Sequence, residues 1–245
     1  MTDRILEIGS AGLESTDQQV KKLMDNLVNA EVPGYKRSEV VVKGFPAALE
    51  SASQKFQPVK PQADTTFYSE LPGALIKTGG ALDVAIGSAG YFVVSGQWGE
   101  GYTRDGRFKL DNDGRLLTVA GNYPVQGEMG PIIVTPGTVV EINQEGDVLV
   151  DQVKVDRLKL VQPEQPGGLE QLSGSLFKRQ DGTVVMQPID NPRVIQGYVE
   201  SSNVNPVDAM MQMIVLERQY SLNGKVVSTR DGNLGRAMEL GRPTQ

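Results

Sequence analysis

The sequence predicts an α+β protein. Helices from the two ends of the chain pair like a coiled coil, extended segments link them, and an antiparallel β-rich domain forms the centre. Two observations lead to this prediction. Apolar residues recur every seven positions at both ends, a repeat typical of helices that supercoil around a partner. Between the ends the period changes to two, which is the spacing of strands with one buried face.

Composition excludes several classes of function. The net charge of −6 argues against a general nucleic-acid binder, whose affinity depends on Lys and Arg neutralising phosphates. The chain contains no Cys and no His, which removes disulfides, thiolate metal sites and the commonest general base. No cofactor or metal is therefore expected. The sequence also predicts no membrane span, and Met1–Arg4 does not read as the start of a secretory signal peptide.

Residues 1–34 are predicted to form the N-terminal helix of an axial helical module. The repeat consists of Leu6, Leu13, Val20 and Leu27, with Leu23 and Ala30 at intermediate positions. Pro33-Gly34 ends the helix, because a residue before proline is displaced from the α region. Lys36 and Arg37 are expected to place charge at the negative end of the helix dipole. Residues 35–72 are predicted to be an extended linker, punctuated by prolines.

Residues 73–187 are predicted to form the central β-rich domain. Val140 and Ile142 alternate with polar residues, and so do the pairs that follow: Val148 and Val150, Val153 and Val155, Leu158 and Leu160. Turns that need a positive φ are predicted at Asp105-Gly106, Asp113-Gly114, Gly146-Asp147 and Asp181-Gly182. Residues 188–204 are predicted to return as an extended segment beside residues 35–72.

Residues 205–245 are predicted to form the C-terminal helix of the same axial module. Asn205 is a good N-cap, Pro206 suits the first helical position, and Asp208 complements the positive end of the dipole. Its seven-residue repeat consists of Met213, Tyr220, Val227 and Leu234, with Leu216 and Ala237 at intermediate positions. Glycines in both terminal helices predict that neither helix is stable alone.

Two stretches superficially resemble chemical motifs. Asp111–Gly114 resembles half of an EF-hand loop, but Lys109 and Ala120 would occupy the first and twelfth ligand positions, so a hairpin turn is the better interpretation. The glycine-rich stretch Gly96–Gly101 lacks the strand–turn–helix context of a phosphate loop and is interpreted as a hairpin loop. The sequence therefore predicts that the chain is not an enzyme.

Three separate stretches resemble the bacterial flagellar rod and hook proteins. Near the N-terminus, Asn26–Arg37 resembles that family's signature. In the centre, Leu82–Ile86, Gly90–Phe92 and Tyr102–Gly106 are similar to its β-domain motifs. Near the C-terminus, Glu200–Asn205 leads into Met213-Ile214 and Arg218–Tyr220, as in these proteins. The resemblance covers nearly the whole chain and is greatest for members from the proximal rod.

The resemblance implies a structural subunit of the basal-body rod that spans the periplasm and transmits torque for motility. It implies export through the flagellar type III apparatus without a cleaved signal peptide. The expected partners are other rod subunits and further copies of the chain, in an open helical assembly. No nucleic-acid partner and no membrane-spanning part are expected. A distal rod or hook subunit is the alternative within the family.

Sixteen residues are the candidates for contacts between subunits. They are Leu6, Leu13, Val20, Leu23, Asn26, Leu27, Asn29, Pro33, Gly34, Asn203, Asn205, Met213, Leu216, Tyr220, Val227 and Leu234. The same heptad pattern is equally compatible with an ordinary intramolecular core, because burial within and between chains has the same sequence signature. Two rival interpretations come from other classes: a secreted β-rich binding protein with a helical stalk, and an acid-dependent glycosidase with two facing carboxylates.

Overall fold

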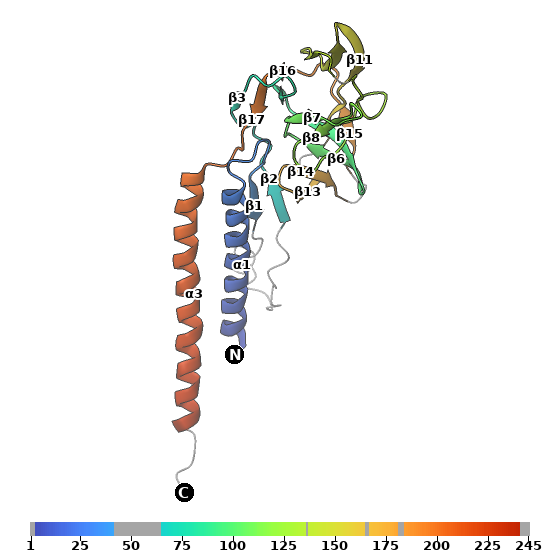
Figure 1. The fold of residues 1–245 in the computed structure, drawn as a ribbon. Helices are drawn as coiled ribbons and strands as arrows, with labels where there is room; N and C mark the ends of the chain where they lie inside the picture. The colour runs from blue at the N-terminus through green and yellow to red at the C-terminus, as the bar shows by residue number, and fades with distance from the viewer. Residues whose placement is uncertain (1–2, 42–64, 136, 165–166, 181–183, 241–245) are drawn as a thin grey trace. The chain divides into compact units, whose positions relative to one another are not determined.

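The computed structural model describes residues 3–41, 65–135, 137–164, 167–180 and 184–240. Within these residues it contains two helices and many short strands in several antiparallel sheets (Figure 1). The chain divides into two compact units. The helical unit comprises Met1–Val28, Ser38–Phe67 and Asn205–Gln245, and the β unit comprises Asn29–Arg37 and Tyr68–Val204.

The helical unit contains α1 (Asp3–Val28), α3 (Pro206–Leu240) and the strand β1 (Ser38–Val41), which pairs with β2 (Thr65–Tyr68). Asn205 caps α3 as its sequence predicts, because its Oδ1 accepts a hydrogen bond from the Val207 amide at 3.0 Å. In the described part of the chain, neither helix combines the length and the apolar character needed to cross a membrane.

The predicted coiled-coil-like pairing of the terminal helices is wrong. A coiled coil needs a continuous buried seam of heptad side chains. Instead, Tyr220 at a heptad position of α3 is 49% exposed, and Met213 and Leu216 are only half-buried. Where α1 approaches α3, Gly12 lies against the polar side chain of Asn223. The fold is strand-rich, and its terminal helices do not form the predicted seam.

The distribution of apolar residues around α3 gives the physical reason. Large exposed side chains lie on the side of the helix opposite to the predicted seam: Val207, Met211, Ile214, Val215 and Leu222. Their spacing of three, four and seven residues places them on one face. With apolar residues on both sides, α3 has no single stripe that one partner helix could cover.

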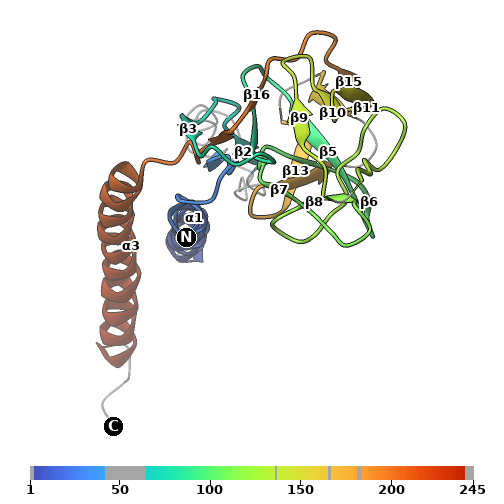
Figure 2. The ribbon, with the colours of Figure 1, turned by 45° about the horizontal axis from the view of Figure 1, so that its top comes forward.

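The β unit is organised around a six-stranded antiparallel sheet with the order β13-β14-β6-β5-β12-β15. Its strands are β5 (Tyr91–Gly96), β6 (Gly99–Thr103), β12 (Leu160–Pro163), β13 (Leu169–Ser173), β14 (Leu176–Arg179) and β15 (Met186–Pro188). A three-stranded sheet contains β9 (Val140–Ile142), β10 (Asp147–Val150) and β11 (Val153–Arg157), seen beside one another in Figure 2.

Three strand pairs complete this unit. They are β3 (Leu75–Lys77) with β17 (Tyr198–Glu200), β4 (Val84–Ile86) with β16 (Val194–Gln196), and β7 (Phe108–Leu110) with β8 (Leu116–Thr118). The return segment of the chain therefore pairs with residues 75–86. It also bonds to the segments predicted to lie beside it, since the Asn203 amide donates to the Tyr35 carbonyl.

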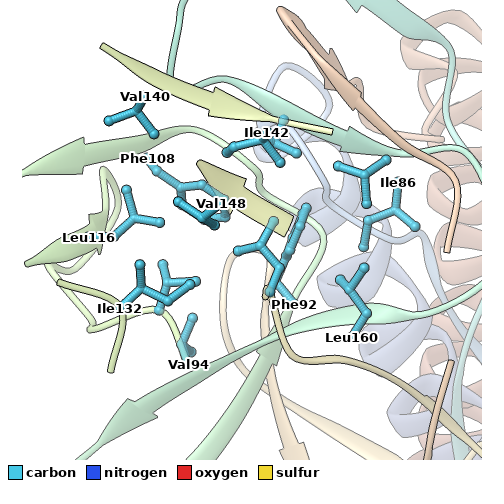
Figure 3. Packing of buried hydrophobic residues seen from close by; sticks show 14 of the residues in the cluster. Ile86, Phe92, Val94, Phe108, Leu116, Ile132, Val140, Ile142, Val148 and Leu160 are labelled. Carbon is cyan, nitrogen blue, oxygen red and sulfur yellow. The ribbon is translucent and has the colours of Figure 1, made fainter. Parts of the chain in front are cut away.

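The central strand β5 is buried on both faces. Phe92 and Val94 point into one core, shown in Figure 3, while Tyr91 and Val93 point into a second core beside Phe177. Alternation of side chains along a strand produces these two faces. The rings of Phe92 and Phe108 meet edge to face, with centroids 5.1 Å apart.

The burial of the strand residues agrees only in part with the predicted alternation. Val140 and Ile142 are buried around an exposed Glu141, as their alternation predicts. Val153 is 67% exposed, so the alternation predicted for β11 does not hold there. Leu158 and Leu160 are both buried, as predicted.

Among the predicted turn glycines, Gly114 and Gly146 adopt positive φ values of 78° and 84°. Gly106 does not belong to this group. Instead, a Cβ at Gly106 would collide with the carbonyl oxygen of Val84, so close approach of two backbones explains that glycine. The predicted turn at Asp181-Gly182 lies outside the described residues.

Both glycine- and aspartate-rich stretches form hairpins, as predicted. Asp111 lies between β7 and β8, and its carboxylate accepts from the amides of Asp113 and Arg115 at 2.9 and 2.8 Å. Gln97-Trp98 connects β5 to β6, and Gly99 after it adopts a φ of 93°.

Asp147 makes the β unit sensitive to acid. Its carboxylate accepts from Arg157 Nε at 2.6 Å and from Lys154 Nζ at 2.7 Å. The bond from Arg157 is the main cause that lowers the pKa of Asp147 from 3.8 to about 2. Because the folded pKa lies below the ordinary value, this carboxylate stabilises the fold above pH 3.8, and the contribution is lost as pH falls toward 2.

We predict that Asp147→Asn reduces the loss of the free energy of unfolding at acidic pH. The wild-type free energy of unfolding should fall faster than that of the variant between pH 3.8 and 2. Urea unfolding at a series of pH values measures both. Exposed Asp190→Asn is the control and should follow the wild type. Parallel curves for wild type and Asp147→Asn would contradict the assignment.

Candidate functional site

Three segments that are far apart in the sequence meet at a buried charge cluster in the β unit. The cluster, called the ionic junction below, consists of Lys36, Arg104 and Glu200, which are 1%, 4% and 1% exposed. Lys36 lies in the segment after α1, Arg104 follows β6, and Glu200 ends β17. Each residue belongs to a different one of the three stretches that resemble the flagellar family.

Glu200 lies between the two cations. Its Oε1 accepts from Lys36 Nζ at 2.7 Å and from the Gly73 amide at 2.9 Å. Its Oε2 accepts from Arg104 Nη1 at 3.0 Å. Lys36 Nζ also donates to the Leu71 carbonyl at 2.9 Å. One carboxylate therefore joins three chain segments and partners two buried cations.

Two backbone carbonyls accept further hydrogen bonds from the terminal nitrogens of the Arg104 guanidinium, while its buried Nε has no partner among the described residues. Nη1 also donates to Ile86 O at 3.2 Å, and Nη2 donates to Ser88 O at 2.9 Å. The guanidinium carbon lies 5.8 Å from the ring centroid of Tyr91. Buried charges are tolerated when they are paired and hydrogen-bonded in this way.

Burial sets the titration behaviour around the junction. Loss of water lowers the pKa of Lys36 from its ordinary value, while the attraction of Glu200 opposes that shift. Burial also raises the pKa of the Tyr91 hydroxyl to about 12, which the nearby positive charge of Arg104 partly offsets. These groups form a structural cross-link, because each charge is directed at a partner within the chain.

Two glycines allow the segments to approach one another. Gly34 has a φ of 70°, and a Cβ there would collide with the backbone of Arg104 and Asp105. A Cβ at Gly73 would collide with the carbonyl oxygen of Ser201. Both positions need glycine because backbone, which cannot move aside like a side chain, occupies the space.

Asn203 fixes the same segments from another side. Its Oδ1 accepts from the Arg37 amide at 2.6 Å, and its Nδ2 donates to the carbonyls of Leu71 at 2.8 Å and Ser69 at 3.3 Å. The Ser69 amide in turn donates to Arg37 O at 2.8 Å. An asparagine side chain can donate and accept at once, which lets it bridge two backbones.

The structure places the sixteen candidate interface residues in different environments. Leu23, Asn26 and Gly34 are buried, whereas Leu13, Val20, Leu27, Asn29, Pro33, Asn203, Met213 and Leu216 are half-buried. Asn205 and Tyr220 are exposed. Leu6, Val227 and Leu234 belong to the helices, but their side chains are outside the described set. The role of all sixteen in contacts between subunits stays a prediction.

Within the helical unit, Asn26 already has partners in its own chain. Its Oδ1 accepts from the Ser38 amide at 2.9 Å, and its Nδ2 donates to Ser38 O at 2.8 Å. The side chain thus bonds Ser38 as a neighbouring strand would. Gly34 and Asn203 are predicted candidates that contact the segments forming the ionic junction.

Sequence reasoning missed the junction itself. Lys36 was expected at the dipole end of α1, but its ammonium is instead buried against Glu200, which lies 164 residues away in the chain. Spacing cannot reveal such a pair. The usable signal is that each of the three family-like stretches contains at least one charged residue, and Lys36, Arg104 and Glu200 among these are buried. Within the described residues, no group of three or more acidic side chains could hold a metal ion.

We predict that removing the shared carboxylate costs more stability than removing one of its two cations. Glu200→Gln leaves both without an ionic partner and should lower the free energy of unfolding by about 3–5 kcal/mol. Lys36→Met leaves Arg104 paired with Glu200 and should cost less. The double variant should cost less than the two single effects added. Denaturant unfolding measures all three.

Exposed Glu170, which pairs with Lys178 at 3.1 Å, supplies the control. Glu170→Gln should change the free energy of unfolding by less than about 0.5 kcal/mol. Additive effects of Lys36→Met and Glu200→Gln, or a larger cost for Lys36→Met, would refute the shared-carboxylate arrangement.

Comparisons with known proteins match two regions of the chain to models of one protein family. Residues 195–240 match the model of the C-terminal region of the flagellar basal-body rod proteins FlgE, FlgF and FlgG. Residues 85–150 match the model of the D1 domain of the flagellar hook protein FlgE and of FlgF and FlgG. The first match includes Glu200 and Asn203, and the second includes Arg104.

Relatives match the chain almost from end to end. The flagellar basal-body rod protein FlgF of Escherichia coli is 33% identical over 97% of this chain and 98% of its own length. FlgF of Caulobacter vibrioides is 30% identical, over 92% of each chain. The rod protein FlgG of Buchnera aphidicola is 31% identical over 96% of this chain and 98% of its own length. The chain therefore belongs to the flagellar basal-body rod and hook family that includes FlgE, FlgF and FlgG.

Proposed function

We propose that this chain is a structural subunit of the flagellar basal-body rod, of the proximal type that FlgF represents. The observation that carries the proposal is the match of nearly the whole chain to proteins named as basal-body rod proteins. The arrangement of the β unit agrees with a structural role, since its buried charges connect segments of the chain.

The assembly surface that we propose is the exposed apolar face of α3. Val207, Met211, Ile214, Val215 and Leu222 are 51–64% exposed along this face. A helix that is apolar on both sides needs partners on more than one side. In an open helical assembly, neighbouring subunits provide those partners through head-to-tail contacts. The partners are other rod subunits and further copies of this chain.

The location and route follow from the same proposal. The subunit lies in the rod that spans the periplasm, has no catalytic role, and is exported through the flagellar type III apparatus without signal-peptide cleavage. We also propose that the chain has five parts, namely residues 1–34, 35–72, 73–187, 188–204 and 205–245. In this division the terminal parts contribute to assembly, and the central part is the β-rich domain.

We predict that Ile214→Asp abolishes assembly without unfolding the chain. Ile214 is 51% exposed, so its replacement should change the free energy of unfolding by less than about 0.5 kcal/mol. In the rod, the same change buries a carboxylate against apolar neighbours, which is costly. Swimming and the amount of the protein in isolated basal bodies, measured in cells that carry only the variant, should both fall to background.

Gln212→Asp is the matched control. Gln212 is also exposed on α3 but lies away from the apolar face, so the variant adds the same charge elsewhere. It should retain swimming. Normal motility of the Ile214→Asp cells would overturn the proposed assembly surface.

A further inference from the structure

The segment Pro33–Arg37, called the strap below, is the end of a stretch, Asn29–Arg37, that belongs to the β unit although the chain on either side of that stretch does not. Residues Met1–Val28 on one side and Ser38–Phe67 on the other are part of the helical unit. The strap is therefore a short peptide that enters the β unit from another compact unit and leaves again. A segment with this connectivity can detach without breaking the strand pairs of the β unit.

Backbone groups hold the strap as a groove holds a peptide. The Gly34 amide donates to Glu200 O at 2.8 Å, and Tyr35 O accepts from the Asn203 amide at 3.3 Å. At the other end, the Arg37 amide donates to Asn203 Oδ1 at 2.6 Å, and Arg37 O accepts from the Ser69 amide at 2.8 Å. Main-chain bonds of this kind provide affinity in peptide recognition, and side-chain sites provide selectivity.

Two side chains and one glycine provide the selectivity. The side chains of Tyr35 and Lys36 are each only 1% exposed. Lys36 Nζ reaches both Glu200 Oε1 and Leu71 O, so the site has a carboxylate and a carbonyl for one ammonium group. Gly34 passes so close to Arg104 and Asp105 that no larger residue fits. The site therefore recognises a peptide that contains the sequence Gly-Tyr-Lys.

The ionic contact favours selective rather than very tight binding. Desolvation of a buried ammonium and carboxylate offsets much of their attraction, so the pair adds little net stability once formed. It still discriminates strongly, because a strap without lysine would leave Glu200 with one cation fewer. A strap held by such contacts can exchange.

We propose that the β unit contains a peptide-binding site for which the strap is the ligand, and that the site also accepts the strap of a second copy. Each copy of the chain carries both the site and the strap. A strap released from one copy therefore finds the same donors and acceptors in the next. Exchange of identical elements between copies creates a link without any new interface chemistry. This inference does not depend on the proposed role in the rod.

The test uses the full-length chain and a fluorescent peptide of residues 29–38. Gly34→Val in the chain should prevent its own strap from docking and leave the site free. Fluorescence anisotropy should then show saturable binding of the peptide to Gly34→Val. The wild type should bind the peptide at least about tenfold more weakly, because its own strap occupies the site. Adding Glu200→Gln to Gly34→Val should weaken binding by a similar factor.

Two control peptides match the two recognition features. One carries Gly34→Val and should not bind, and the other carries Lys36→Met and should bind about tenfold more weakly. A Gly34→Val chain that keeps its near-ultraviolet circular dichroism but binds no peptide would overturn the proposal. Equal binding to all three chains would overturn it as well.

If Gly34→Val does not fold, Lys36→Met in the chain decides the question, since it weakens the hold on the strap without a steric clash. That variant should bind the unmodified peptide more tightly than the wild type does, and failure to do so would refute the site. For exchange between copies, Gly34→Val and Glu200→Gln chains are mixed. The mixture should form a hetero-pair that neither forms alone, and its absence would refute the transfer of the strap.

Discussion

The burial of one carboxylate between two cations organises this molecule. Glu200 is 1% exposed and bonds Lys36, Arg104 and the Gly73 amide, which lie in three segments separated by long stretches of chain. A charge at such depth is tolerated only when its partners are in place. Three features must therefore form together. They are the path of the chain after α1, the close approach at Gly34, and the return of the chain at β17.

The β unit combines this junction with an ordinary apolar framework. Its central strand β5 contributes Phe92 and Val94 to one core and Tyr91 and Val93 to another. The apolar cores provide most of the stability, because burial of apolar surface is the dominant favourable term in folding. The junction instead determines where the segments at the ends of the helices join the β unit. Tyr91 connects the two, since it packs on Phe177 and lies beside Arg104.

Sequence reasoning found features that depend on local chemistry. The Asn205 cap, the hairpin at Asp111 and the positive φ of Gly114 and Gly146 all follow from neighbouring residues. It failed where the outcome depends on distant partners. The heptad pattern in α3 predicted a coiled-coil seam because a sequence repeat identifies an apolar stripe but not whether a partner covers it.

The same contrast between local features and long-range contacts applies to the candidate site. Gly34 and Asn203 were selected from family-like stretches, yet their partners could not be inferred from spacing. For Lys36 the local sequence predicts only an interaction with the helix dipole, because its actual partner is distant in the chain. Glu200 lies 164 residues from Lys36, and Arg104 lies 96 residues from Glu200. Pairing at such separations is a property of the fold, so the junction became visible only in three dimensions.

Native-state amide hydrogen exchange on the wild-type chain tests the central claim most directly. The amides of Gly34, Arg37, Gly73 and Asn203 each bond across the junction. If Glu200 and its partners hold the segments as one cooperative element, these four amides should share a single opening free energy, lower than that of the β5 amide of Val93. Four unrelated values, or rapid exchange at Gly73 while Gly34 stays protected, would contradict the account.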